Sequence, residues 1–313
     1  MIKLLELFGG IGAPRKALEN IGLDVKSIDY VEIDDKPVRS YNAMFDNNKK
    51  PQNICGWDLK PDILVHGSPC QDISIAGKML GADKESGTRS SLMWETLRII
   101  DNFGVWKPKI VVWENVTGVL HKRMVKNFKQ YLWRMESMGY SNSFSILNAM
   151  DFGLPQKRKR VFTVSVLSKT KFDFGKVVKR NRRSLHDFLG NYGKQHIMWQ
   201  PSMLKNMGGN DSAFSNRIMP INDYCYTITV RQDRCPNSGV IAIGDGKYRY
   251  LTERECWRLQ GFSDIDYDNA LKVNPCKPGR MNRNLYKQAG NSMPVTILEE
   301  IFKSLLINKT NCG

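Results

Sequence analysis

The sequence predicts an α/β fold: a doubly wound, mostly parallel sheet followed by a smaller, irregular domain. Apolar, strand-like runs alternate with helical segments over about the first half of the 313 residues. Such alternation is typical of parallel sheets with helices on both faces and ligands at the carboxyl ends of the strands. After about residue 168 the alternation ends, and residues 190–250 are rich in Gly, Asn, Ser and Tyr.

The individual elements follow from apolar runs and from the residues that end them. Short buried strands are predicted at residues 3–8, 25–31, 63–65, 110–113 and 161–166. Helices are predicted at residues 14–20, 90–102 and 125–138, and a helical pattern returns at Val295. Pro14 suits a first helical turn, and Gly22 and Gly139 suit the residue after a helix. We expect residues 1–175, completed by a C-terminal helix at 284–313, to form one domain and residues 176–283 to form the other.

The charge of the chain is unevenly distributed. The formal net charge is +16; residues 1–150 contain 20 basic and 17 acidic side chains, whereas residues 151–313 contain 27 and 14, or +13. A basic half beside a nearly neutral half favours a polyanion that docks on one side. A membrane surface is disfavoured, because no basic amphipathic helix with a strong apolar face is present.

Composition excludes several classes of protein. No apolar run approaches the roughly 18 residues of a membrane span, and Glu6 interrupts the N-terminal run before a signal-peptide core could form. The seven cysteines are scattered without a C-x-x-C pair, which argues against a disulfide framework and a structural zinc site. We therefore expect a cytoplasmic protein with no membrane partner and no bound metal.

A glycine-rich loop, Phe8-Gly9-Gly10-Ile11-Gly12, joins the first predicted strand to the first helix. Glycines there allow the backbone to approach a ligand closely, although such a turn can be purely structural. Arg15 occupies the third glycine position of a G-x-G-x-x-G pattern, which disfavours a nicotinamide dehydrogenase. Glu32 ends the next strand, where an acid can hold ribose hydroxyls. Together the two features favour a nucleoside-containing cofactor.

Two further side chains follow neighbouring predicted strands. Cys70, in Gly67-Ser68-Pro69-Cys70-Gln71, is placed for nucleophilic attack, or it is a small buried hydrophobe, as most free cysteines are. Glu114 ends the neighbouring strand, so it falls on the same edge of the sheet. A carboxyl beside a thiol indicates a general acid/base pair; the alternative is a capping or salt-bridged glutamate.

A basic run, Gln156-Lys157-Arg158-Lys159-Arg160, leads into the predicted strand at 161–166. A period of two puts Arg158 and Arg160 on one face. A solvated basic loop is the usual interpretation of such a run. Two arginines on one face can instead fix a carboxylate, a phosphate or a base carbonyl.

Taken together, these motifs resemble those of the C5-cytosine DNA methyltransferases, the bacterial and phage modification enzymes, in order and over nearly the whole chain. The motifs are residues 8–12, Glu32, 69–71, 114–116, 156–160, 254–262 and 288–292. The resemblance implies a Rossmann-like methyltransferase fold with S-adenosylmethionine as its cofactor. The cofactor would be bound by Phe8, Gly10, Gly12, Glu32, Asn291 and Ser292, with Ile33 against the adenine.

The same resemblance implies a covalent mechanism on a cytosine flipped out of double-stranded DNA. Cys70 would add to C6, Glu114 would protonate or hydrogen-bond N3, and Arg160, with Arg158, would bind O2 and help to keep Cys70 ionised. Residues 176–283 then resemble a target-recognition region for a short sequence. A cognate restriction endonuclease is a further partner that the resemblance allows, and we expect a monomer.

Two alternatives remain open at this point. One is an RNA cytosine methyltransferase, since one eukaryotic branch of the family modifies tRNA; Ser68 stands here in place of that branch's second proline. The other is a catalytically inactive DNA-binding protein. The intact set of Cys70, Glu114 and Arg160 argues against it.

Overall fold

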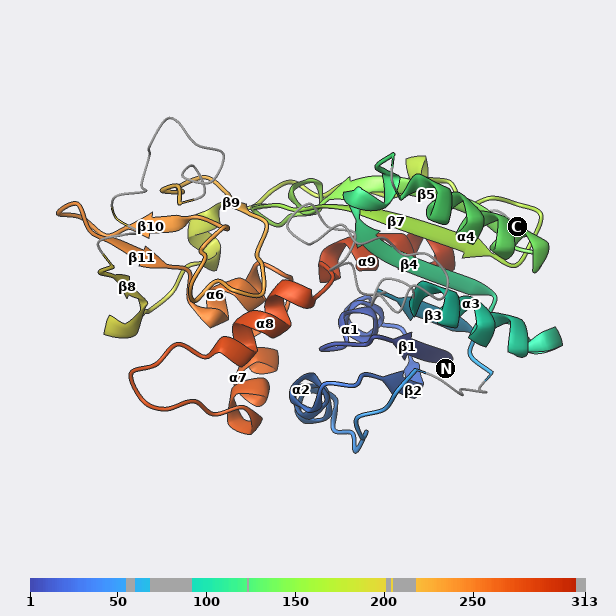
Figure 1. Ribbon diagram of the computed structural model, residues 1–313, viewed down its shortest axis with the longest axis horizontal. Coiled ribbons are helices and arrows are strands. Elements are labelled where there is room, and N and C mark those ends of the chain that lie inside the picture. The colour runs from blue at the N-terminus through green and yellow to red at the C-terminus, as the bar shows by residue number, and fades with distance from the viewer. Residues whose placement is uncertain (55–59, 68–91, 123, 201–203, 205–217, 308–313) are drawn as a thin grey trace.

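The computed structural model describes residues 1–54, 60–67, 92–122, 124–200, 204 and 218–307. Figure 1 shows a larger lobe built around one sheet and a smaller lobe with short strands. The sheet has the strand order β2-β1-β3-β4-β7-β5. Its strands are β1 (Ile2–Leu7), β2 (Val25–Val31), β3 (Ile63–His66), β4 (Ile110–Val116), β5 (Ser141–Asn148) and β7 (Lys159–Val166).

The first four strands of this sheet are parallel, and β7 runs antiparallel between β4 and β5. Helices cover both faces: α1 (Ala13–Asn20) and α9 (Val295–Phe302) on one, and α3 (Met93–Asn102) and α4 (Val125–Ser137) on the other. Neighbouring strand residues alternate between the two cores, as Leu4 and Leu5 do, because side chains of a strand point to opposite faces in turn. The predicted doubly wound, mostly parallel sheet is confirmed.

Two elements of the larger lobe were not predicted from the sequence. Helix α2 (Asp35–Phe45) begins at Asp34, whose side chain accepts a hydrogen bond from the amide of Lys36. Its apolar residues Val38, Tyr41, Met44 and Phe45 recur every three or four positions and face one cluster, so the helical period is present in the sequence and was missed. Strand β5 carries serine or asparagine at most positions and pairs with β7 alone within the sheet. An edge strand needs less apolar surface than a central one, and the apolar pattern that predicts strands is therefore faint.

The smaller lobe is irregular, as predicted, and contains short strands. Strands β8 (Ile197–Met198), β10 (Val240–Ala242) and β11 (Tyr248–Tyr250) form one small sheet, and β6 (Gln156–Lys157) pairs with β9 (Cys225–Tyr226). Three helices, α6 (Glu253–Arg258), α7 (Asp264–Val273) and α8 (Arg283–Asn291), lie between the two lobes (Figure 1). Their apolar residues share one hydrophobic cluster with α1 and α9. The predicted division into two domains, with boundaries after residues 175 and 283, stays a prediction. The boundary after residue 283 separates α6 from α8, although these helices share one cluster.

The predicted single helix at 284–313 is wrong within the described residues. Helix α8 ends at Asn291, residues 292–294 are extended, and α9 begins after Pro294, followed by a π-helical turn at Lys303–Ile307. Proline cannot donate the backbone hydrogen bond that would continue α8. The break leaves two residues at the end of a helix: Asn291, which is exposed, and Ser292, which is 6% exposed.

Arg180 fixes the segment that leads from the larger lobe into the smaller one, through hydrogen bonds to the larger lobe. The amide of Arg180 donates to the carbonyl of Asp151 at 3.0 Å. Its guanidinium donates to carboxylates of both Glu299 and Glu300 on α9, at 2.5 and 2.6 Å. The two glutamate side chains are only 9% and 6% exposed, so this arginine compensates two nearly buried charges.

Replacement of Arg180 by alanine should lower the free energy of unfolding by about 1–3 kcal/mol, since it leaves buried Glu299 without its cation and Glu300 with Lys303 alone, 2.9 Å away. Arg182→Ala is the matched control, because Arg182 pairs with Asp223, whose side chain is 65% exposed. That change should cost about 0.5 kcal/mol or less. Urea unfolding of the two variants measures both values, and equal losses would contradict the role of Arg180.

Candidate active site

The glycine-rich loop at residues 8–12 leaves β1 in an unusual backbone conformation. Phe8, Gly10 and Gly12 have φ angles of 55°, 54° and 74°, in the left-handed region that favours glycine. A Cβ at Gly12 would also lie 2.6 Å from Phe45 and 2.7 Å from Tyr41. Gly12 is therefore required for packing under the loop, at the N-cap of α1. The loop lets β1 turn sharply into that helix.

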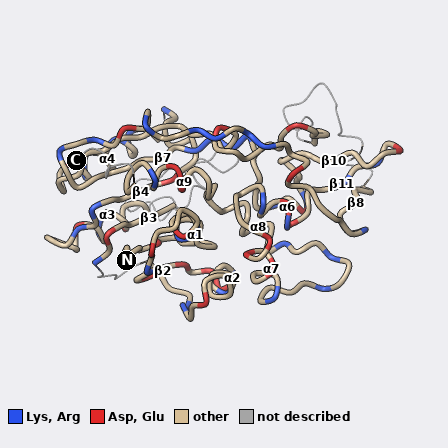
Figure 2. The backbone as a smooth tube through the Cα atoms, turned by 180° about the vertical axis from the view of Figure 1, so that it is seen from behind, with Lys and Arg blue, Asp and Glu red and all other residues tan. Residues whose placement is uncertain are grey.

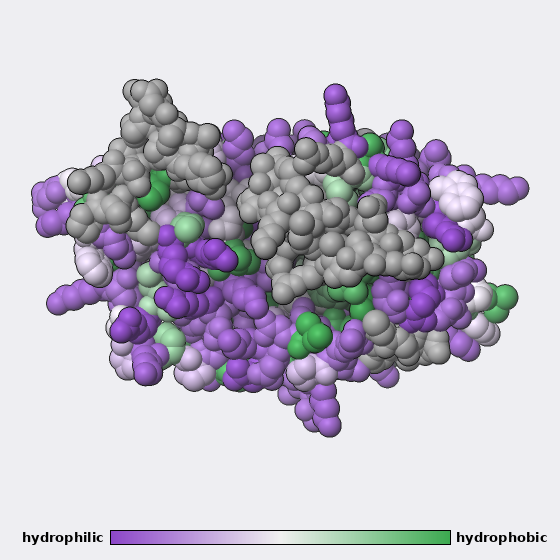
Figure 3. Space-filling view, viewed as in Figure 1, coloured by the Kyte–Doolittle hydropathy of each residue, from purple (hydrophilic) through white to green (hydrophobic). Residues whose placement is uncertain are grey.

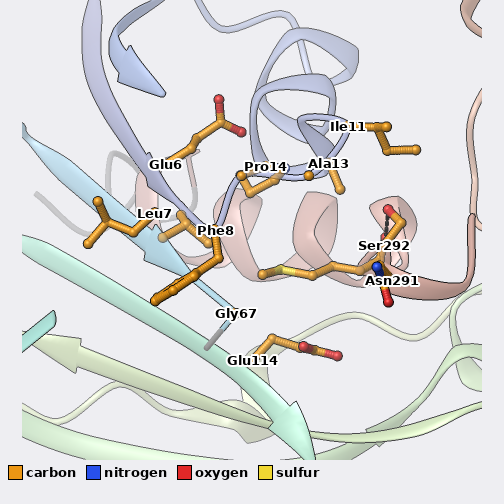
Figure 4. A pocket seen from close by; sticks show the side chains of 14 residues that line it. Glu6, Leu7, Phe8, Ile11, Ala13, Pro14, Gly67, Glu114, Asn291 and Ser292 are labelled. Carbon is orange, nitrogen blue, oxygen red and sulfur yellow. Dashed lines mark hydrogen bonds between the residues drawn. The ribbon is translucent and has the colours of Figure 1, made fainter. Parts of the chain in front are cut away.

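A pocket that is partly open to solvent lies against this loop. Figure 4 shows that its walls come from the glycine loop, the end of β3, Glu114 on β4 and the end of α8. It brings together five of the residues predicted from the sequence: Phe8, Gly10, Glu114, Asn291 and Ser292. The remaining walls are Glu6, Leu7, Gly9, Ile11, Ala13, Pro14, Val65, Gly67 and Met293.

Glu32 lies behind the loop and holds it. One carboxylate oxygen accepts a hydrogen bond from the amide of Gly10 at 3.1 Å, and the other accepts from the amide of Asp34 at 2.9 Å. Burial raises the pKa of Glu32. Ile33, the next residue, has a side chain that is 72% exposed. Glu32, Ile33 and Gly12 are not among the residues that line the pocket, although Glu32 and Gly12 shape its loop.

Glu114 and Arg160 form an ion pair across two antiparallel strands. Arg160 Nε lies 3.1 Å from Glu114 Oε1, and the two side chains are 14% and 13% exposed. Within the described part of the chain, Glu114 Oε1 accepts no aligned hydrogen bond. The pair is thus largely buried, and its carboxylate, Glu114, lines the pocket.

Arg158 makes contacts of a different kind. Its guanidinium donates to the carbonyls of Ile228, Gly290 and Ser292, at 2.9, 3.1 and 2.9 Å. Along the chain, Arg158 stands between β6 and β7 and belongs to neither strand. Its side chain is buried. A Cβ at Gly290 would lie 2.5 Å from backbone atoms at 229–230, so α8 approaches that segment very closely. Arg158 connects the pocket wall to the smaller lobe.

Cys70 lies outside the described residues. The described segment 60–67 ends at Gly67, three positions before Cys70. Gly67 lines the pocket. Strands β3 and β4 are parallel, with His66 opposite Trp113. The end of β3 therefore lies next to the strand that carries Glu114.

Glu6 was missed as a site residue, although it lines the pocket and is completely buried. Its carboxyl accepts a hydrogen bond from the Tyr41 hydroxyl at 2.8 Å and one from the amide of Arg15 at 3.4 Å. Burial raises the pKa of Glu6 to about 7. An acidic residue between two leucines, within the apolar end of β1, is the sequence signal that could have identified it.

The raised pKa of Glu6 predicts a stability that falls as the pH rises. The folded protein binds this proton more tightly than the unfolded chain does, so the stabilisation is complete below the ordinary pKa of 4.5 and is lost as the pH rises through about 7. Between about pH 5.5 and about pH 8 the loss should be about 2 kcal/mol. Glu6→Gln cannot titrate and should lose less than the wild type.

Urea unfolding at both pH values measures this difference. Glu136→Gln, which changes an exposed carboxyl on α4, is the matched control and should follow the wild type. A wild-type protein that loses no more stability than Glu6→Gln over this range would contradict a buried, proton-binding Glu6.

Comparisons with known proteins agree with this arrangement. Residues 2–306 match the family described as C-5 cytosine-specific DNA methylase. A type II methyltransferase of Lactococcus lactis subsp. cremoris is 37% identical over 253 residues, which is 78% of this chain and 66% of that protein. The orphan methyltransferase M.SssI of Spiroplasma monobiae is 43% identical over 261 residues, 78% of this chain and 65% of that protein. The chain thus spans about two thirds of the length of these relatives.

Solved structures show the fold. The Dnmt2 methyltransferase of S. pombe superposes with a TM-score of 0.76 at 17% identity, over 99% of this chain and 100% of that one. A methyltransferase of Entamoeba histolytica superposes with a TM-score of 0.73 at 17% identity, over 99% of both chains. With its motifs in order and its sequence matched almost from end to end, this chain belongs to the C-5 cytosine-specific DNA methylase family.

Proposed function

We propose that the protein transfers a methyl group from S-adenosylmethionine to C5 of a cytosine in a short double-stranded DNA sequence. The observation that carries the proposal is the pocket in which the glycine loop and the end of α8 face Glu114, itself paired with Arg160. The residues proposed to bind the cofactor and Glu114, the carboxyl of the ion pair, thus line one cavity. Family membership supports the reaction type.

The residues present fit the cofactor. The backbone of Gly10 lines the pocket, and a Cβ at that position would meet nothing within 4 Å, so the loop leaves room for a ligand. A carboxylate can accept about four hydrogen bonds, and the oxygens of Glu32 retain capacity for ribose hydroxyls beside Gly10 and Asp34. Phe8, Asn291 and Ser292 would complete the walls, and Ile33 would lie against the adenine. S-adenosylmethionine, when bound, supplies the methyl group.

The chain's own residues would activate the base. Cytosine C5 is a weak nucleophile, so the Cys70 thiolate would first form a bond to C6 while Glu114 donates a proton or hydrogen bond to N3. Arg160 would hold Glu114 in place and bind O2. After C5 has gained the methyl group, it would lose its proton to solvent. The electrons of that C–H bond would form the C5–C6 double bond as the bond between C6 and the sulfur breaks, N3 would return its proton to Glu114, and Cys70 would leave as thiolate.

We assign Arg158 a positioning role in place of the catalytic one predicted from the sequence. Its guanidinium is occupied by the carbonyls of Ile228, Gly290 and Ser292, and two of these residues flank Asn291. Arg158 would therefore act on the cofactor wall, and Arg160 on the base.

The smaller lobe and the basic segment before it would dock on DNA. Figure 2 shows Lys and Arg positions following one another along the edge that connects β7 to the smaller lobe, and Lys179 and Arg183 there are 73% and 61% exposed. Figure 3 shows mostly hydrophilic side chains on the visible face of this lobe. In the described ranges, no helix is long and apolar enough to span a membrane. Flipping the cytosine would cost a few kcal/mol, offset by contacts in the pocket.

We propose, as the sequence predicts, a monomer that acts in the cytoplasm. A further point of the proposal rests on the relatives. The Lactococcus relative is named a type II methyltransferase and the Spiroplasma relative an orphan methyltransferase. The first supports a cognate restriction endonuclease as a further partner, and the second supports action without one.

Covalent trapping tests the reaction. A 5-fluorocytosine at the target cannot lose fluorine as a cation, so with S-adenosylmethionine present the DNA should stay joined to Cys70 after methyl transfer. Cys70→Ser should abolish the adduct, because a serine hydroxyl is hardly ionised near neutral pH. Glu114→Gln should slow its formation by removing the proton source for N3. Denaturing electrophoresis and peptide mapping measure both.

The matched control is Cys256→Ser, since Cys256 is completely buried and burial raises the pKa of its thiol; it should trap normally. Trapping of a tRNA substrate in place of DNA would favour the RNA methyltransferase. Specific DNA binding without methyl transfer would favour the inactive binding protein. An adduct on another cysteine would contradict the role of Cys70.

Arg158 and Arg160 should respond differently to replacement. Arg160→Lys should lower kcat about a hundredfold with little change in the KM for S-adenosylmethionine, because it contacts the reacting base. Arg158→Lys should raise that KM and lower Tm, because one ammonium cannot serve three carbonyls. Steady-state kinetics and thermal unfolding distinguish the two, and a fall in kcat alone for Arg158→Lys would restore its catalytic assignment.

A further inference from the structure

We propose that Tyr30 is a positioning residue for the cofactor: its hydroxyl fixes the carbonyl of Gly10 and so holds the glycine loop in its binding shape. The inference rests on the proposed function and adds a residue that lies in none of the sequence motifs. Tyr30 is on β2, two positions before Glu32, and it does not line the pocket.

Three consecutive residues at the end of β2 hold the loop. The Tyr30 hydroxyl donates to the carbonyl of Gly10 at 2.5 Å, and the amide of Gly9 donates to the carbonyl of Val31 at 3.1 Å. The amide of Gly10 donates to Glu32 at 3.1 Å. The carbonyl of Gly10 is thus bound by Tyr30 and its amide by Glu32. These two residues are two positions apart, so their side chains point to the same side of the chain.

The loop needs such restraints because its backbone is strained. Phe8 has a φ of 55°, a conformation that is costly for a bulky side chain and persists only where the surroundings enforce it. Gly10, with a φ of 54°, has no side chain that packing could hold. Hydrogen bonds to its backbone are therefore the means of fixing it, and Tyr30 supplies the one to its carbonyl.

Tyr30 is itself rigid. It is completely buried, and its ring stacks on that of Tyr41 with 3.9 Å between centroids. A Cβ at Gly9 would lie 2.5 Å from the Tyr30 ring, so the glycine lets the loop rest directly on the aromatic surface. Burial raises the pKa of Tyr30 above the ordinary value for tyrosine. The hydroxyl therefore stays protonated, and able to donate, throughout the physiological pH range.

From this arrangement Tyr30 acts through Gly10 and touches neither cofactor nor base. Removing its hydroxyl should loosen the loop before the cofactor binds, and the cofactor would then have to order it. Such a change weakens cofactor binding and leaves the rate of the chemical step nearly unchanged.

Tyr30→Phe tests this, because phenylalanine keeps the stack on Tyr41 and removes only the hydroxyl. Tyr140→Phe is the matched control: Tyr140 is also buried, and its hydroxyl donates to the carbonyl of Pro108 at 2.7 Å, on the other side of the sheet. Calorimetric titration with S-adenosylhomocysteine and steady-state kinetics with S-adenosylmethionine are the measurements. Tyr30→Phe should raise Kd and KM about fivefold, with kcat within about twofold of the wild type. Tyr140→Phe should change none of them.

Hydrogen exchange gives a second measurement on the protein without cofactor. Tyr30→Phe should speed exchange in peptides that cover residues 8–12, and Tyr140→Phe should not. Wild-type affinity in Tyr30→Phe, or equal weakening in both variants, would overturn the role of Tyr30 alone. If the wild-type protein bound neither S-adenosylhomocysteine nor S-adenosylmethionine, the proposed function would fail and this inference with it.

Discussion

The buried guanidinium of Arg158 is the point on which the sheet, the pocket and the smaller lobe all depend. A buried charge is tolerated only when hydrogen bonds replace its hydration, and here carbonyls from two distant segments do so. Gln156, two residues earlier, bonds the carbonyl of Leu259 at 2.7 Å and accepts from the amide of Ile228 at 3.1 Å. The strand that carries Arg160 therefore cannot shift without moving the end of α8 and the smaller lobe together.

The ion pairs Arg249–Glu255 and Arg160–Glu114 have the same chemistry but different surroundings. The first has a structural role, and we assign the second a role in the reaction. Arg249 and Glu255 form a bidentate pair at 2.8 and 2.9 Å, almost completely buried, and Glu255 also accepts hydrogen bonds from the amides of Thr252 and Gly190. Glu114 is more exposed and lies at the pocket wall. Glu255, with four hydrogen bonds, fixes the backbone around it, whereas Glu114 is placed to engage a substrate.

The sequence alone was sufficient for most of the sheet and for the positions of Glu114, Asn291 and Ser292, because periodicity and ordered motifs are local signals. It was insufficient for β5, whose apolar pattern is faint, and for the break between α8 and α9; α2 was missed although its apolar residues have the helical period. The contacts of Arg158 and Tyr30 also could not be predicted, since they join residues that only the folded chain brings together. The placement of Cys70 relative to Glu114 remains a prediction.

Helices α1 and α9, which flank the pocket, come from distant parts of the chain. The side-chain amide of Asn20 donates a hydrogen bond to the carboxylate of Glu299 at 2.7 Å, across 279 positions of sequence. The pocket likewise joins residues 6–14 to residues 291–293. Contacts between such distant residues form late and slowly, because a long loop must first close. During synthesis on the ribosome, the first strands can pair long before the pocket exists. The nascent polypeptide would therefore be unable to use the cofactor as a folding aid until residues 291–293 had emerged.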